Sequence, residues 1–177
     1  MNRKAIFVVA VALFSFAAWA QNAPKPGAEV KKLDYFAGTW TVEGTIPQGP
    51  WGAGGKFSST DTSEWMEGSF FVVSHSDFKM PSELGGDGKE TAIMGYDTQL
   101  NLYTYDAFNS QGQHASSKGT ISGDTWTWTS EANHDGQDVK QKMTMKVLSP
   151  SSYSVKVEVS MDGTTWMTVM EAKATKK

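Results

Sequence analysis

The sequence predicts an all-β fold: an antiparallel up-and-down barrel of about ten strands with one short N-terminal helix. Three observations support this prediction. Thr, Val, Trp, Tyr and Phe dominate after residue 38, several segments alternate apolar and polar side chains, and turn residues interrupt the chain at short intervals. Because a meander that closes on itself leaves no unpaired edge, we expect a closed barrel, with a two-sheet sandwich as the alternative.

The first 20 residues have the features of a cleaved secretory signal. Two basic residues precede an apolar stretch, and Ala18-Trp19-Ala20 places small residues at the positions that a signal peptidase reads. We therefore expect cleavage after Ala20, a flexible leader over residues 21–27 and a single barrel domain over residues 28–177. The expected location is the periplasm or the extracellular medium.

Composition limits the possible partners. Loss of the signal leaves 157 residues (177 minus 20) and a net charge of −5, from 14 basic and 19 acidic side chains. Nucleic acid binds basic faces, so we expect no nucleic-acid partner. No second apolar stretch is long enough to span a bilayer, so we expect no stable membrane insertion. The absence of cysteine excludes disulfides and thiolate metal sites. Separately, we expect the protein to be a monomer.

Ten segments fit strands and one fits a helix. Residues 28–37 predict a short helix that ends at Gly38, a favourable residue just after a helix. Asp-Gly, Gly-Asp and Ser-Pro-Ser turns separate several of the later segments. The expected strands are 39–46, 56–66, 69–78, 90–97, 101–109, 114–121, 124–130, 138–148, 152–160 and 164–173.

The clearest alternation lies in the last third of the chain. One set of side chains is predicted to face the interior, namely Met143, Met145, Tyr153, Val155, Val157 and Val159. The complementary set is predicted to face solvent, namely Lys140, Lys142, Lys146, Lys156 and Glu158. Lysines turned inward would leave unpaired buried charges, which cost several kcal/mol each.

Two Gly- and Pro-rich segments, residues 47–55 and 79–89, follow the first and third predicted strands. Because strands of a meander alternate in direction, both segments lie at the same end of the barrel. We expect them to frame a ligand entrance.

No local motif predicts a reaction or a metal site. The stretch WGAGGKF fails as a phosphate loop, because Pro50 replaces its first glycine and Phe57 replaces its Ser or Thr. The three histidines, His75, His114 and His134, are too far apart in sequence for a local metal motif. We therefore predict no catalytic residue, no metal and no cofactor.

Aromatic strand residues are the candidate ligand site, because Tyr and Trp combine a large apolar area with a polar group. A closed ten-stranded barrel is also wider than side chains easily fill. Gly44 shares a face with Trp40, which we place near the closed floor, and its missing side chain predicts space there. His75 alternates with Phe71 and Val73, on an apolar face. The candidate ligand-binding residues are Trp40, Gly44, Trp65, His75, Tyr96, Tyr105 and Trp128.

Several segments resemble known families. LDYFAGTW, in which Gly-x-Trp opens the first strand, resembles the start of calycin-type barrels. GSFFVVSHSDF, IMGYDTQLNLYTYDAFNSQG and GTISGDTWTWT are similar to the DUF1579 family of uncharacterised, often exported bacterial proteins. The resemblance implies a barrel like those of fatty-acid-binding proteins and nitrobindin, and it implies no established activity.

Two departures from those barrels are visible. The interval after the first strand has no room for the two-helix lid of fatty-acid-binding proteins. No histidine follows His134, where nitrobindin-like proteins carry their haem ligand, although His75 or His114 could take that role. The resemblance therefore does not favour haem.

These features predict an exported barrel that binds a small hydrophobic or aromatic molecule. Two alternatives stay open. One is an enzyme that uses a strand carboxylate or His75 as a general base in the same cavity. The scattered carboxylates that the sequence offers are Asp61, Glu64, Glu67, Asp97 and Asp106, and any two of them could face each other in a barrel. The other is a packed barrel that acts through its surface as an envelope interaction module. A cavity separates the first two from the third, and a strongly shifted pKa inside it separates the enzyme from the binder.

Overall fold

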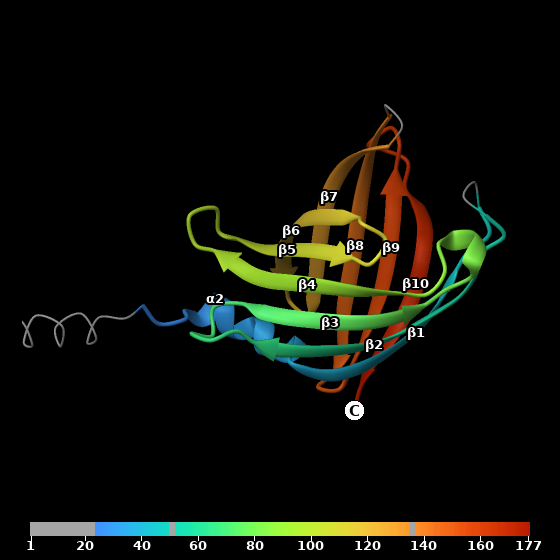
Figure 1. Ribbon diagram of the computed structural model, residues 1–177. Helices are drawn as coiled ribbons and strands as arrows, with labels where there is room; N and C mark the ends of the chain where they lie inside the picture. Colours follow the sequence, from blue (N-terminus) through green and yellow to red (C-terminus); the bar gives the residue numbers. More distant parts are fainter. Residues whose placement is uncertain (1–23, 50–51, 135–136) are drawn as a thin grey trace, which may run out of the picture.

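The computed structural model describes residues 24–49, 52–134 and 137–177 (Figure 1). The predicted signal segment, its cleavage site and the start of the predicted leader lie outside the described residues. Within the described ranges, no helix combines the length and the apolar character needed to cross a membrane.

The fold is a closed barrel of ten antiparallel strands, as the sequence predicts. Strand β1 pairs with β2 on one side and with β10 on the other, which closes the meander and excludes the two-sheet sandwich. Strands β2–β5 lie across the view in Figure 1, whereas β7–β10 lie roughly upright and alternate in direction. The strands are β1 (Gly38–Ile46), β2 (Gly55–Trp65), β3 (Val72–Lys79), β4 (Gly88–Asp97), β5 (Leu102–Asn109), β6 (His114–Ser122), β7 (Thr125–His134), β8 (Gln137–Ser149), β9 (Ser152–Ser160) and β10 (Met167–Lys176).

The predicted helix over residues 28–37 is divided into two short pieces. One α-helical turn, α2 (Ala28–Lys31), runs into a 3₁₀ helix, η1 (Lys32–Phe36). A tighter last turn gives the final carbonyl groups partners, and the amide of Ala37 donates to the carbonyl of Asp34 at 3.2 Å. The segment is too short to be stable alone, so packing against the barrel decides its form.

The helical segment closes one end of the barrel, called the floor below. Leu33 and Phe36 are buried in the barrel core. The Nε1 group of Trp40 donates to the carbonyl of Phe36 at 2.9 Å, which places Trp40 beside this floor as predicted. The hydroxyl of Tyr103 donates to the Glu29 carboxylate at 2.8 Å, which ties α2 to β5.

The predicted inward and outward faces of β8 and β9 are confirmed. Met143, Met145, Tyr153, Val155 and Val157 face the interior. Outside, ion pairs join the Glu158 carboxylate to Lys142 at 3.0 Å and to Lys156 at 2.8 Å. Val159, near the other end of β9, is only partly buried.

Candidate ligand-binding cavity

The barrel encloses a cavity of about 560 Å³. It reaches from Phe36 at the floor to Ile46, Met80 and Leu84 at the opposite end, which we call the mouth. Pockets for small molecules have volumes of about 300–1,000 Å³. The interior is therefore not filled by side chains, and this contradicts the premise of the packed-barrel alternative.

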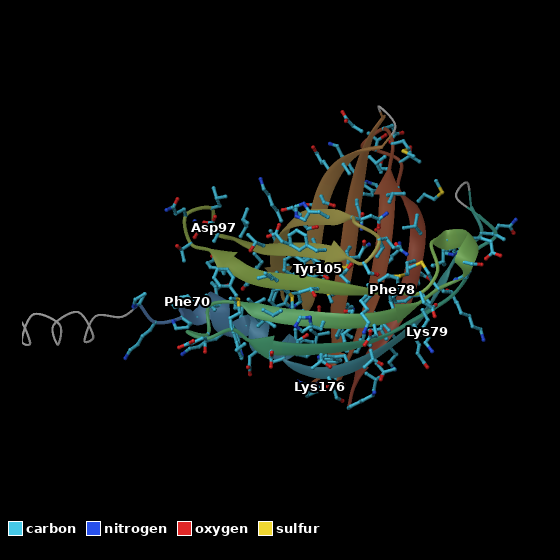
Figure 2. The ribbon with its side chains drawn as sticks, viewed as in Figure 1. Phe70, Phe78, Lys79, Asp97, Tyr105 and Lys176 are labelled. Carbon is cyan, nitrogen blue, oxygen red and sulfur yellow. The ribbon has the colours of Figure 1, made fainter. Side chains whose placement is uncertain are left out.

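Loops meet at the mouth. The β1–β2 and β3–β4 connections lie at this end, as predicted, and η2 (Ser82–Leu84) forms part of the second. The Nε2 group of Gln111, in the β5–β6 loop, donates to the carbonyl of Gly85 at 2.7 Å. Figure 2 shows Phe70 at the floor end, Tyr105 over the middle of the barrel and Phe78 nearer the mouth.

One wall of the cavity is mainly apolar, with Gln141 on β8 as a polar member. It consists of side chains from β8, β9, β10 and β1. The pairing of β10 with β9 shifts register between Thr168 and Met170. At this irregularity two consecutive residues, Val169 and Met170, both line the cavity. The apolar wall comprises Val42, Met143, Met145, Val155, Val157, Val169 and Met170.

The facing wall, on β2–β6, combines small and polar side chains with the larger Phe57, Phe78, Met94 and Tyr105. Consecutive cross-strand partners on its inner face are Ser63, Ser74, Ala92, Ala107 and Ala115. Side chains this short do not reach the apolar wall. All of them except Ala92 line the cavity, so small side chains at one level of adjacent strands leave space there.

Two carboxylates belong to the polar wall. Asp61 on β2 pairs with Ser76 on β3, and Ser76 pairs with Glu90 on β4. All three side chains line the cavity. The hydroxyl of Tyr105 on β5 donates to Oε1 of Glu90 at 3.4 Å. We call Asp61 and Glu90 the acidic pair.

Burial raises the pKa of both members of the acidic pair. For Asp61, the hydroxyls of Ser59 and Ser76 oppose this effect without cancelling it. For Glu90, burial again dominates the raised pKa; the Tyr105 hydrogen bond opposes it and the Asp61 charge adds to it. Burial and these two carboxylates raise the pKa of Tyr105 well above its ordinary value of 10.0, so this residue remains a hydrogen-bond donor.

Two buried polar atoms of the cavity lining have no hydrogen-bond partner among the described residues. One is the acceptor Oδ1 of Asp61, and the other is the donor Nε1 of Trp128. Most buried polar atoms in proteins are paired, because an unpaired one costs about 1–3 kcal/mol. An unpaired acceptor and an unpaired donor in one cavity are the arrangement expected where a polar ligand binds.

Three of the seven predicted ligand-binding residues line the cavity: Trp40, Tyr105 and Trp128. Two others lie at the floor and are not part of the lining. The Nε1 group of Trp65 donates to Oδ1 of Asp34 at 2.9 Å, and the Tyr96 ring lies 4.9 Å from the ring of Tyr103. Both belong to the packing that surrounds the floor.

Two placements were wrong. A methyl group on Gly44 would collide with the Glu171 carbonyl and with Ala172 on β10, so this glycine permits close strand contact and leaves no space. His75 is exposed, and its Nδ1 lies 3.1 Å from Oγ1 of Thr91 on the outside of the barrel. The residues of β3 that face the cavity are the alternate ones on either side of His75, namely Ser74 and Ser76.

The other ionisable residues singled out from the sequence lie away from the cavity. Glu64 and Glu67 are exposed, and Oδ1 of Asp97 accepts turn amides. Asp106 lies 3.8 Å from His114, whose ring stacks on Phe108 outside the barrel. The side chain of His134 is outside the described set. In the part of the chain that the structure describes, no three His, Asp or Glu side chains form a metal-binding group.

Sequence reasoning missed Glu90 and the serine positions. The sequence did contain an indication of this, because Glu90 alternates in step with Met94 and Tyr96 and so lies on the same face of β4. Asp61 likewise shares parity with Trp65 on β2. Side chains two residues apart share a face of a strand, so polar residues at the same alternate positions as inward aromatic residues also point inward. Such inward polar residues indicate a solvated cavity wall and not a packed core.

The fold and the cavity define a class: closed ten-stranded β-barrels with an internal, two-sided pocket. A model of the family described as "Protein of unknown function (DUF1579)" matches residues 25–176. The chain therefore belongs to the DUF1579 family. A search of curated proteins found no match.

Two solved structures are similar in fold. One is Rv2717c from M. tuberculosis, with a TM-score of 0.58 and 10% identity, over 85% of this chain and 98% of that chain. The other is a de novo designed fluorescence-activating β-barrel, with a TM-score of 0.46 and 12% identity, over 83% of this chain and 98% of that one. At such low identity the first likeness shows the barrel fold alone.

Proposed function

We propose that this protein is an exported, monomeric, calycin-type barrel that binds a small and partly apolar molecule in its cavity. The cavity of about 560 Å³ is the observation that carries the proposal. Its apolar wall offers burial to the body of a ligand, and its polar wall offers hydrogen bonds that fix the orientation. Asp61 Oδ1 and Trp128 Nε1, which have no partner among the described residues, would accept one hydrogen bond from the ligand and donate one to it.

Binding can be tested with Nile red, a neutral dye that fluoresces in apolar surroundings. Wild-type protein should bind the dye. Ser117→Trp places an indole in the cavity and should weaken dye binding by at least about tenfold, because the volume that buries the dye is occupied. Lys118→Trp is the matched control, since Lys118 is the exposed neighbour on β6.

The control variant should bind the dye as the wild type does. Equal affinity in the wild type and both variants would place the dye outside the barrel and contradict the proposal. Circular dichroism of both variants, compared with wild type, separates loss of the cavity from loss of the fold.

A second candidate function is acid–base catalysis in the same cavity. The observation in its favour is that burial raises the pKa of both Asp61 and Glu90, as in many catalytic carboxyl groups. Mass spectrometry of molecules recovered after incubation with a host extract separates the two functions. A binder returns its ligand unchanged, whereas an enzyme returns a molecule of altered mass, and the Asp61→Asn variant abolishes the alteration.

A further inference from the structure

The ionisable lining of the cavity has one sign of charge. Asp61 and Glu90 are acidic, and no Lys, Arg or His is among the described residues that line the cavity. Lys176, whose Nζ lies 5.2 Å from the centre of the Trp40 ring, is not part of the lining. A ligand that carries a negative group would bring a further anion to two poorly solvated carboxylates.

We propose, building on the proposed function, that the ligand is a small apolar amine whose protonated nitrogen lies between Asp61 and Glu90. The remainder of the molecule packs on the apolar wall of β8–β10. The ligand class is thus a hydrophobic primary or secondary amine.

The spacing of the acidic pair suits one shared cation. Two strand spacings of about 4.8 Å separate the backbones of Asp61 and Glu90, which gives about 10 Å. Ser76 lies between them in the register, and its short side chain leaves the gap over β3 open. A protonated primary amine has three donors. It can bond to both carboxylates, including the unpaired Oδ1 of Asp61.

Three aromatic residues are neighbours of the acidic pair. Trp40 is the β1 partner of Asp61, and Tyr105 donates to Glu90. Tyr153 on β9 is close enough for the Asp61 charge to contribute to its raised pKa. Aromatic faces attract cations, and desolvated sites strengthen the attraction. Carboxylates combined with aromatic rings favour a cation over a neutral donor.

Trp128 provides independent support for a polar ligand. Its side chain is 1% exposed, it lines the cavity, and its Nε1 has no partner among the described residues. The ring lies 5.5 Å from that of Tyr105, which links Trp128 to the acidic pair along one wall. An oxygen atom on the same amine could accept from this indole, which would suit an amino alcohol or amino amide.

The proposal predicts a pH dependence of binding. The groups that face Asp61 from neighbouring elements are Glu90 on β4, Tyr105 on β5 and Tyr153 on β9. An amine binds the ionised carboxylates, and burial raises the pKa of both. Amine affinity should therefore fall as the pH decreases through these raised values, whereas the affinity for a neutral ligand should not change.

Three matched molecules test the proposal by calorimetry: octylamine, octanol and octanoate, which share a chain and differ in the charge of the head group. Octylamine should bind at least about tenfold more tightly than octanol, because charge-assisted hydrogen bonds are about twice as strong as neutral ones. Octanoate should bind more weakly than octanol. The preference for the amine should shrink to less than about threefold in Asp61→Asn with Glu90→Gln.

Glu64→Gln is the control, because Glu64 is an exposed carboxylate on β2. This variant should keep the full preference for octylamine. If octanol or octanoate binds as tightly as octylamine, or if Nile red binds and octylamine does not, the amine proposal fails and the proposed function stands. If neither Nile red nor any of the three molecules binds, both fail.

Discussion

At the scale of single residues, Asp61 combines burial, an unpaired oxygen and a raised pKa. Such a group lowers stability when it is ionised, because part of its hydration is lost and not replaced. A protein that keeps such a residue in a cavity bears a cost that ligand binding can relieve. Functional sites are places where this kind of local conflict with stability is expected.

The pKa of Asp61 leads to a stability prediction with a definite sign. The folded protein holds this proton to higher pH than the unfolded chain does. The stability contributed by Asp61 is therefore lost as the pH rises from the ordinary pKa of 3.8 through the raised folded value. Asp61→Asn should therefore increase the free energy of unfolding by about 1 kcal/mol at about pH 8.

Denaturant titrations of the wild type and Asp61→Asn at about pH 8 and about pH 3.5 check this prediction. The gain should vanish at the lower pH, where the carboxyl group of the wild type is protonated. A variant that is less stable than the wild type at the higher pH would show that Asp61 stabilises the empty barrel, against this prediction.

Asp162 is predicted to act in the opposite direction. Its Oδ1 accepts the amides of Thr164 at 2.7 Å and Thr165 at 2.6 Å in the β9–β10 turn, which lowers its pKa below the ordinary 3.8. This stabilisation is present above that ordinary value and is lost as the pH falls through the lowered one. Asp162→Ala should therefore destabilise the protein at neutral pH and have little effect in strong acid.

Thermal melts across the acid range measure this difference, and Asp162→Asn is the matched variant because it keeps one carbonyl acceptor for the two amides. Asp162→Asn should lie between the wild type and Asp162→Ala at neutral pH. A destabilisation by Asp162→Ala that persists unchanged in strong acid would show that the carboxylate charge is not the source of the effect.

At the residue scale the sequence predicted part of the site. Trp40, Tyr105 and Trp128 line the cavity because large aromatic residues in barrel strands favour the inner face. His75 was assigned to the wrong side of the sheet. It shares a face with Phe71 and Val73, and these two residues are apolar although they face outward. Apolar character at alternate positions does not separate the two faces of a strand whose inward residues include Ser74 and Ser76.

At the scale of elements, the strand order was readable and the strand ends were less so. The predicted strand 69–78 begins at Val72 in the structure, because Gly68 and Ser69 adopt positive φ in the preceding turn. The predicted strand 164–173 begins at Met167, because Asp162 holds Thr164 and Thr165 in the turn. Backbone conformation and side-chain hydrogen bonds in turns decide such boundaries, and alternation alone does not reveal them.

The seam between β1 and β10 closes the barrel, and Gly44 determines how closely the two strands approach. A methyl group there would overlap the Glu171 carbonyl and Ala172. Gly44→Ala should therefore lower the free energy of unfolding by about 1–3 kcal/mol, because the backbone must shift to accept it. Thr45→Ala, at the exposed neighbour, should cost about 1 kcal/mol at most.

Denaturant unfolding measures both variants, and hydrogen exchange of the β10 amides locates the effect. Faster exchange in β10 is expected for Gly44→Ala and not for Thr45→Ala. A fully stable Gly44→Ala protein would contradict the close approach at the seam.

At the scale of the whole molecule, barrel closure could be predicted from the sequence, whereas the volume of the cavity could not. Ten sequential strands with short turns have few ways to remove their edges other than closure. The volume inside depends on which residues fall at the same level of adjacent strands. Ser63, Ser74, Ala92, Ala107 and Ala115 meet through the register of five strands, and parity patterns do not determine that register.

Export is a separate prediction for the whole chain. Ala18-Trp19-Ala20 supplies a signal-peptidase site, so the exported protein should begin at Gln21. N-terminal sequencing of protein recovered from outside the cytoplasm checks this, and Ala20→Asp should block processing. Exported protein that begins at Met1 would refute the cleavage.

The central claim is that the cavity holds a ligand between the acidic pair and the apolar wall, and a crystal structure grown with octylamine tests it most directly. The predicted result is an ammonium group within about 3 Å of an Asp61 or Glu90 oxygen, with the alkyl chain against Met143, Val155 and Val157. A structure in which the side chains of the two walls meet, or in which the cavity is open but contains no octylamine at saturating concentration, would contradict the claim.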